Sequence, residues 1–326
     1  MSNLPQDRHD HAQPSAARVP RGKTRRIGTA QRMLAAAATT LSAVFGPREP
    51  RSFGILMYHR VTNVLPGLPA PTWNVTPEHF EAQLTGLLQR GFRARPLRDL
   101  LDLHRRGQPI SPGTFVVTFD DAYGNVFLNA FPILQKLQIP ATLFLATAYL
   151  DLVQPFPSDD WSAAGTPAAP VDSWRPLTTA ECLEMQASGL VELAAHTHTH
   201  ADFRTRPDDL LLDLMTNQAV LREKFGVENA TFAFPYGTKS DGFSCPVLAA
   251  VVKAADLSCA LTTEGQLVRP GDDPFDWGRF AAEDHDTAAT LAAKLDGWHT
   301  AVRWLGLRVL GRPTYSPASP STKVPA

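Results

Sequence analysis

Residues 115–121 read Phe-Val-Val-Thr-Phe-Asp-Asp, and the prediction of the fold starts from this stretch. A short run of β-branched and aromatic residues is typical of a strand buried on both faces of a parallel sheet. The run leads directly into Asp120 and Asp121, and a carboxylate is costly to bury unless it is paired or binds a metal. The two aspartates are therefore expected either to be solvated in a loop or to be held in a site at the end of this strand.

Strand and helix patterns alternate on both sides of this stretch. Further strands are predicted at 53–58, 141–146, 190–195, 230–234, 258–262 and 278–282, and helices at 77–89, 97–106, 127–137, 178–188, 207–225, 246–255 and 287–304. This alternation predicts a single domain with a distorted, TIM-like (β/α) barrel of about seven parallel strands. An open, doubly wound sheet is the alternative, and in both folds the active site lies at the carboxyl ends of the strands.

The ends of the chain differ from this central part. We expect a basic, partly disordered tail with a short apolar helix at 1–50, the barrel at 51–305 and a disordered tail at 306–326. The apolar run from Met33 to Phe45 is too short to span a bilayer, so no transmembrane span is expected. It follows a basic cluster, and we expect it to contact a membrane surface or to pack on the protein. Both a cytoplasmic and a cell-envelope location agree with this pattern.

A second polar cluster, His196-Thr197-His198-Thr199-His200, follows the predicted strand 190–195. Imidazole is the commonest side-chain metal ligand near neutral pH. On a helical turn His196 and His200 would share a face, whereas on an extended strand all three histidines would do so. Two histidines and one carboxylate leave coordination positions open for water, as in catalytic metal sites. A solvated loop is the alternative, but two such clusters at predicted strand ends favour a metal site.

Three motifs in this chain resemble those of the polysaccharide deacetylase family. They are Thr118-Phe119-Asp120-Asp121, the histidine cluster at 196–200 and Phe234-Pro235-Tyr236-Gly237, in the family's order and spacing. The stretch 55–61, Ile-Leu-Met-Tyr-His-Arg-Val, also resembles the opening strand of its exopolysaccharide-type members. The resemblance covers roughly residues 53–300. It implies a distorted (β/α) barrel that removes acetyl groups from N-acetylated sugars with a divalent metal, most commonly zinc.

The resemblance also implies a role for individual residues. Asp121, His196 and His200 correspond to the metal ligands of the family, and Asp120 corresponds to its general base. The backbone N–H near Tyr236 corresponds to a donor for the oxyanion. This division agrees with the chemistry, because a free carboxylate beside a metal can accept a proton from the attacking water.

The chain departs from the family pattern at two places. Ala233 stands where many members carry an Arg, and Arg279 is the candidate to support Asp120 instead. No Leu-x-x-His marks the general acid. We assign that role to His285, which follows the last predicted strand among carboxylates that would raise the pKa of an imidazole. A solvated loop position is the alternative for His285, and His59 at the end of the first strand is the competing proton donor.

The predicted function is metal-dependent deacetylation of an N-acetylhexosamine polysaccharide or glycan. The alternatives are a hydrolase of another C–N amide bond and a barrel that binds glycans without hydrolysis. Asp120 favours hydrolysis, because a binding module needs no base beside its metal. The formal net charge of −1 gives no reason to expect a nucleic-acid partner. The segment 151–176 is the candidate for a loop that covers the substrate.

Overall fold

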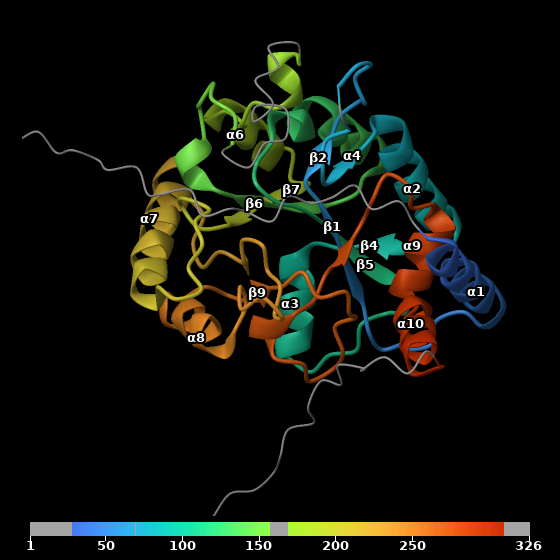
Figure 1. Cartoon of the computed structure of the whole chain (residues 1–326). Coiled ribbons are helices and arrows are strands. Elements are labelled where there is room, and N and C mark those ends of the chain that lie inside the picture. Colours follow the sequence, from blue (N-terminus) through green and yellow to red (C-terminus); the bar gives the residue numbers. More distant parts are fainter. Residues whose placement is uncertain (1–27, 69, 157–168, 310–326) are drawn as a thin grey trace, which may run out of the picture.

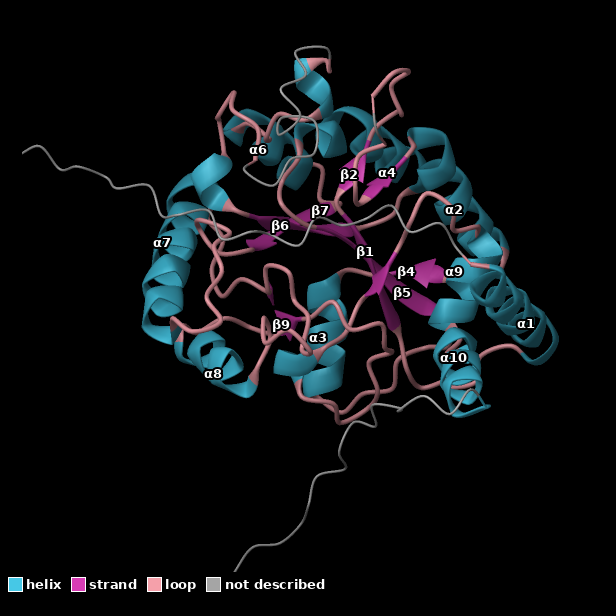
Figure 2. Ribbon diagram, viewed as in Figure 1, coloured by secondary structure: helices cyan, strands magenta, loops and turns pink. Residues whose placement is uncertain are grey.

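The computed structural model describes residues 28–309, except 69 and 157–168. Parallel strands form its centre in the order β10-β1-β5-β6-β7-β8-β9, and helices surround them (Figures 1 and 2). The strands are β1 (Gly54–Tyr58), β5 (Thr114–Phe119), β6 (Ala141–Leu145), β7 (Val191–Ala195), β8 (Phe232–Ala233), β9 (Ala260–Leu261) and β10 (Phe280–Ala281). Three short strands, β2 (Arg60–Val61), β3 (Asn74–Val75) and β4 (Arg93–Ala94), add a small ribbon and an extra neighbour of β5. The predicted barrel-like α/β fold is confirmed.

The barrel closes between β9 and the segment that leads into β10. Leu261 forms a parallel bridge with Trp277. The Trp277 carbonyl accepts a hydrogen bond from the Thr262 N–H at 2.7 Å, and the Trp277 N–H donates to the Ala260 carbonyl at 3.3 Å. The strands on this side are short, so the barrel is distorted as expected.

Most helices lie on the outside of the strands, but one of them contributes Leu97, Leu100 and Leu101 to the apolar cluster on the inner side. The helices are α1 (Thr29–Phe45), α2 (Pro77–Gln89), α3 (Leu97–Arg105), α4 (Phe131–Leu137), α6 (Thr179–Ala187), α7 (Pro207–Phe225), α8 (Pro246–Ala254), α9 (Ala288–Leu295) and α10 (Trp298–Val309). Local signals explain several of their starts. Pro77 opens α2, and Thr178 caps α6 in a capping box with Glu181.

Two of the predicted helices differ from the structure. The single helix expected at 287–304 is wrong, because Gly297 adopts a left-handed φ of 84° and separates α9 from α10. The helix expected at 127–137 begins instead as a π-helical turn at Val126–Ala130. The α-helical part starts only at Phe131, with Pro132 in its first turn, where a missing N–H leaves no hydrogen bond unmade.

Helix α1 packs against α9 and α10. Ser42 is buried and its hydroxyl donates to Asp296 at 2.6 Å, while the Phe45 and Trp298 rings lie 6.0 Å apart. Packing on the protein, one of the two expectations for this segment, is therefore confirmed for one face of α1. No described helix is both long and apolar enough to cross a membrane. Residues 1–27 and 310–326 of the predicted tails lie outside the described residues. The disordered tail predicted at 306–326 is wrong for residues 306–309, because α10 continues to Val309.

The two faces of the strands pack into two separate apolar clusters. The outer cluster joins the strands to the surrounding helices, and the inner cluster contains Ile55, Val116 and Ala194. Side chains alternate between the faces of a strand, so residues two or four positions further along continue the inner row. This alternation carries Asp120 and His196 to the carboxyl end of the barrel, above the inner cluster.

Candidate metal and catalytic site

The three predicted metal ligands come together at the carboxyl ends of β5 and β7. Oδ1 of Asp121 lies 3.1 Å from Nε2 of His200 and 3.4 Å from Nε2 of His196. One ligand atom from each of these residues lies within 4.8 Å of the others. Nδ1 of His196 is 2.8 Å from the Ala233 carbonyl, which assigns the proton to Nδ1 and leaves the Nε2 lone pair directed at the cluster. Burial alone would raise the pKa of Asp121, but His200 and His196 hold it well below its ordinary value.

Left-handed backbone brings these ligands together. Asp121 has a φ of 74°, Thr197 of 64° and His200 of 53°. Such values are uncommon for residues other than glycine and concentrate at functional sites. Residues 196–200 therefore form neither the helical turn nor the extended strand considered from the sequence. The Thr197 hydroxyl accepts a hydrogen bond from the His200 N–H at 3.0 Å and closes the turn.

Helix α7 holds this histidine turn from outside the cluster. The Asp213 carboxylate accepts from the backbone N–H groups of His198 and Thr199, and from the Thr199 hydroxyl. One helical turn later, Nδ2 of Asn217 donates to the Thr197 carbonyl at 2.6 Å. Sequence reasoning missed Asp213 and Asn217. Their only sequence signal is an i, i+4 pair of small polar residues on a helix that follows the cluster.

His198 points away from the ligand cluster. Its Nδ1 lies 2.9 Å from the Thr147 hydroxyl, and Tyr149 donates its hydroxyl to the carbonyl of neighbouring Thr199 at 3.1 Å. The three-residue cluster formed by Asp121, His196 and His200 does not include it.

Asp120 is held by an ion pair with Arg279. Nη1 and Nη2 of Arg279 donate to the two carboxylate oxygens at 2.6 and 2.8 Å, in a bidentate pair. Both side chains are buried. Nε of Arg279 donates to the Thr262 carbonyl at 3.2 Å, which fixes the guanidinium plane. Burial alone would raise the pKa of Asp120, but Arg279 and His196 together place it below its ordinary value. The expected support of Asp120 by Arg279 is confirmed.

The structure places His59, rather than His285, beside Asp120. Nε2 of His59 lies 4.0 Å from Oδ2 of Asp120, and its ring stacks on Trp73. His285 has a 46% exposed side chain, and its Nδ1 pairs with Glu283 at 3.2 Å. The geometry therefore does not support the expected proton donor, His285, because its side chain is engaged at the surface. His59, the alternative, is the histidine that lies near Asp120.

Tyr236 lies next to His200 in a tight turn. Its ring centroid is 4.9 Å from that of His200, and its hydroxyl donates to the His200 carbonyl at 3.3 Å. Burial raises the pKa of Tyr236 to about 12, so the phenol is protonated near neutral pH. Tyr236 and Gly237 have φ values of 63° and 56°. A Cβ at Gly237 would lie 2.8 and 2.9 Å from atoms of Thr263, so only glycine fits this turn.

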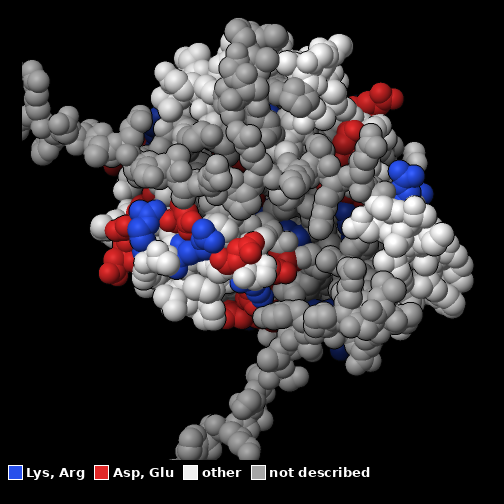
Figure 3. Space-filling model, in the orientation of Figure 1, with Lys and Arg blue, Asp and Glu red and all other residues white. Residues whose placement is uncertain are grey.

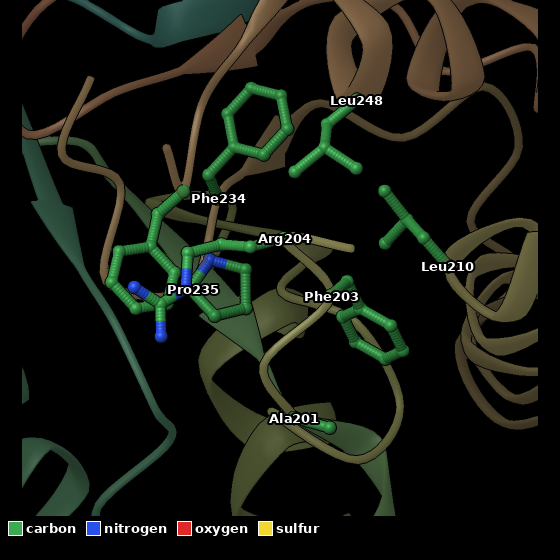
Figure 4. Close-up of a pocket in the computed structure, with 8 residues that line it drawn as sticks. Ala201, Phe203, Arg204, Leu210, Phe234, Pro235 and Leu248 are labelled. Atoms are coloured by element: carbon green, nitrogen blue, oxygen red, sulfur yellow. The ribbon is translucent and has the colours of Figure 1, made fainter. Parts of the chain in front are cut away.

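A small apolar pocket lies outside the ligand cluster. It is lined by Ala201, Phe203, Arg204, Leu210, Phe234, Pro235, Phe243 and Leu248, all of which are drawn in Figure 4. None of the three predicted ligands lines it. We assign it to packing between the segments that follow the second and third motifs. The predicted covering loop 151–176 includes residues 157–168, which lie outside the described residues, so its role stays a prediction.

Comparison with known proteins agrees with this geometry. A sequence model of the family described as polysaccharide deacetylase matches residues 107–253. The chain is 25% identical over 236 residues to a poly-beta-1,6-N-acetyl-D-glucosamine N-deacetylase of Staphylococcus aureus, covering 70% of this chain and 73% of that protein. It is 30% identical over 158 residues to the Escherichia coli protein of the same name, covering 48% of this chain and 23% of the relative.

Solved structures show the same fold. The structure of IcaB from Ammonifex degensii aligns with a TM-score of 0.62 at 25% identity, over 77% of this chain and 98% of that one. The Streptococcus pyogenes deacetylase PplD aligns with a TM-score of 0.61 over 76% of this chain and 99% of that one, and at 18% identity it supports the fold alone. The motifs, the fold and these relatives lead to one assignment: residues 107–253 match the polysaccharide deacetylase family, and the fold around them is the one that its solved members have.

Proposed function

We propose that the substrate of this deacetylase is a β-1,6-linked N-acetylglucosamine polymer. The observation that supports hydrolysis is the position of Asp120. Its carboxylate pairs with Arg279 beside the cluster of Asp121, His196 and His200. The polymer is supported by the names of the Staphylococcus aureus and Escherichia coli relatives.

The ligand cluster fits a divalent cation. It offers two imidazole nitrogens and one carboxylate oxygen. The hydrogen bond from Nδ1 of His196 to the Ala233 carbonyl orients the ring, as is usual for metal-bound histidines. Two nitrogen donors and one oxygen donor, with open positions, are typical of catalytic zinc, and we propose zinc as the resident metal. Such a cation, when bound, lowers the pKa of water and polarises a carbonyl oxygen.

The remaining groups of the site supply proton transfer. Hydrolysis consumes one water, breaks the amide C–N bond and yields acetate and a free amine. Asp120, whose pKa lies below its ordinary value, is ionised near neutral pH and accepts a proton from the water. The departing nitrogen needs a proton, and His59 beside Asp120 is placed to donate it in its protonated form. Burial lowers the pKa of His59, and the carboxylates of Asp121 and Asp120 oppose this shift by favouring the imidazolium. The backbone N–H of Tyr236 is the proposed second support for the developing oxyanion.

A direct assay tests this proposal against a glycan-binding barrel without turnover. The chain is loaded with zinc and incubated with a β-1,6-linked N-acetylglucosamine pentamer, and acetate and free amine are measured in parallel. A β-1,4-linked pentamer serves as the comparison substrate. We expect equimolar acetate and amine from the β-1,6 polymer and loss of both in Asp120→Asn. Full zinc occupancy without acetate release from either pentamer would overturn the proposal.

We also propose that the outer face of α1 contacts an anionic membrane surface. Met33, Val44 and Phe45 are 68%, 67% and 67% exposed, and no charged residue stands between Met33 and Phe45. On the side of α1 the surface is largely free of charged side chains (Figure 3). Residues 18–32, which end in the first turn of this helix, include six basic residues and no acidic one; the basic residues are Arg18, Arg21, Lys23, Arg25, Arg26 and Arg32. An apolar helix face beside basic charge is typical of binding to anionic lipid.

Vesicle sedimentation tests this contact. The full chain should bind vesicles that contain phosphatidylglycerol more tightly than vesicles of phosphatidylcholine alone. Replacing Met33 and Val44 by Gln should weaken that binding without changing the barrel, because these two side chains face solvent, whereas Phe45 is kept because its ring contacts Trp298. Equal binding by the double variant, or a concentration-dependent dimer that the variant abolishes, would refute the membrane contact.

A further inference from the structure

Trp73 lies over His59 at the mouth of the barrel. The two ring centroids are 5.2 Å apart and the ring planes differ by 23°, so the rings are stacked. Trp73 is 52% exposed, whereas the His59 side chain is only 14% exposed. The indole therefore shields the proposed proton donor with one face and presents a large part of its surface to solvent.

The backbone around Trp73 is built to hold it there. Strands β2 and β3 pair at the base of the loop, and the Arg60 N–H donates to the Trp73 carbonyl at 3.2 Å. The Asn74 side chain accepts from the Thr62 N–H at 3.1 Å and donates to the Thr62 carbonyl at 2.9 Å. The loop that runs from β2 to Trp73 is thus pinned at both of its ends.

Stability of the fold does not explain this arrangement. Trp73 has a φ of 55°, a left-handed conformation that is costly for a bulky residue. The side chain gains little burial in return, because half of it is in water. Strained, exposed residues of this kind are found mainly where a ligand uses them. The site next to Trp73 is the one at which the proposed substrate reacts.

We propose that Trp73 is a stacking platform for the sugar next to the one that is deacetylated. This inference rests on the proposed function. One indole face is occupied by His59, so a ligand uses the other face, which is separated from His59 by the thickness of the ring. A sugar stacked there cannot be the one whose acetamido group reacts beside Asp120. The apolar C–H face of a pyranose matches a flat, half-exposed indole, and its hydroxyl groups remain in water.

The platform predicts a dependence on chain length. We measure kcat and KM for the β-1,6-linked pentamer and for the methyl β-glycoside of single N-acetylglucosamine, which cannot reach the platform while it reacts. Trp73→Ala should raise the KM for the pentamer about tenfold, the order of effect of losing an aromatic contact. The kcat/KM for the monosaccharide should fall much less than that for the pentamer, because the monosaccharide loses only the contact of the indole with His59. Trp73→Tyr should restore most of the affinity, because it restores an aromatic face.

Two controls separate the platform from a structural effect. Trp73→Gly removes the ring and relieves the left-handed backbone, so it reports on the missing face even if Trp73→Ala folds poorly. Val64→Ala alters another exposed apolar side chain, 48% exposed, in the same loop and should leave both substrates unaffected. Zinc content and thermal unfolding are measured for every variant and should match the wild type.

The outcomes separate this inference from the proposed function. Equal losses on pentamer and monosaccharide in both truncations would mean that Trp73 only positions His59, and would overturn the platform. Unchanged kinetics on both substrates would overturn it as well. An inactive wild-type protein would instead refute the proposed function. In that case calorimetric titration of the pentamer into Asp120→Asn and Asp120→Asn/Trp73→Ala still tests the platform, which requires about tenfold weaker binding by the double variant.

Discussion

The two halves of the site are held in place in different ways. The ligand half, Asp121, His196 and His200, depends on left-handed turns and on hydrogen bonds from α7. The proton-transfer half, Asp120 and His59, lies at strand ends, and its charge is balanced by the buried Arg279. Backbone conformation therefore positions the side chains of the ligand half, and electrostatic pairing positions those of the proton-transfer half. Changes in the ligand half should therefore alter metal affinity, and changes in the other half should alter turnover or stability while metal is retained.

The largest effect is expected in the ligand half. His196→Ala and His200→Ala each remove one of the three proposed metal ligands, so we expect the proposed zinc to be lost on dialysis and activity to disappear with it. His198→Ala is the matched control from the same turn, because its ring faces Thr147, and it should retain zinc. Metal content by atomic absorption checks this. Equal zinc loss in all three variants would show that the turn binds metal in an extended form.

Substitutions of the two adjacent aspartates should have different effects on metal content and on turnover. Asp120→Asn should keep zinc and lose about 10²- to 10⁴-fold in kcat, since an amide cannot accept the proton of the water. Asp121→Asn should lose zinc instead. Metal content and kcat measured on the same preparations test the division. Near-normal activity in Asp120→Asn would remove Asp120 from the role of base.

Breaking the ion pair should affect stability more than any other change in the proton-transfer half. Arg279→Leu leaves the buried Asp120 carboxylate without its partner, which costs about 3–5 kcal/mol in comparable pairs. Denaturant unfolding measures the loss. The double variant Asp120→Asn/Arg279→Leu should recover part of it, because no unpaired charge remains. A loss in Arg279→Leu that the double variant does not reduce would argue against a stabilising role of the pair.

The same ion pair predicts a pH dependence. The pKa of Asp120 in the folded chain lies below the ordinary 3.8, so its stabilising contribution is fully present above 3.8 and is lost as the pH falls through the folded value. Arg279→Leu removes the main cause of the lowered pKa. The midpoint of acid unfolding should therefore move to higher pH in that variant.

His59 and His285 give a smaller, catalytic test of the proton-transfer half. His59→Ala should lower kcat about 10²-fold, the usual size of a general-acid contribution, with zinc retained. His285→Ala is the control at the surface and should have wild-type kcat, because its ring pairs with Glu283 in solvent. The reverse result would return the role of proton donor to His285.

The sequence predicted which residues gather at the strand ends better than it predicted how the loops after the strands turn. The strand alternation placed Asp120, Asp121 and His196 at strand ends, and the barrel followed from the same pattern. The turn at 196–200 was not predictable, because left-handed φ values at Thr197 and His200 depend on contacts made by distant residues. His285 was expected near the site because of its strand position. Sequence distance alone could not show that its loop turns the side chain toward solvent.

Asp213 should give the smallest effect, and it tests whether α7 shapes the ligand half. Its carboxylate accepts from the Thr199 hydroxyl and from two successive N–H groups of the histidine turn. Asp213→Asn keeps the size of the side chain but exchanges one acceptor oxygen for a donor, so the N–H groups lose part of their support. Loss of such outer hydrogen bonds typically weakens metal binding about 10- to 100-fold, and we expect the lower end because Asn217 still holds the Thr197 carbonyl.

The matched control for Asp213 lies on the same helix. Asp209→Asn removes an exposed carboxylate that pairs with Arg206 in the first turns of α7, and it should leave zinc affinity unchanged. Competition with a chromophoric chelator gives the zinc dissociation constant of each variant without reference to turnover. If Asp213→Asn and Asp209→Asn bind zinc equally tightly, the turn keeps its shape without α7. The left-handed residues alone would then position the ligands. The ligand half would differ from Asp120, which is held by an ion pair, only in its backbone conformation.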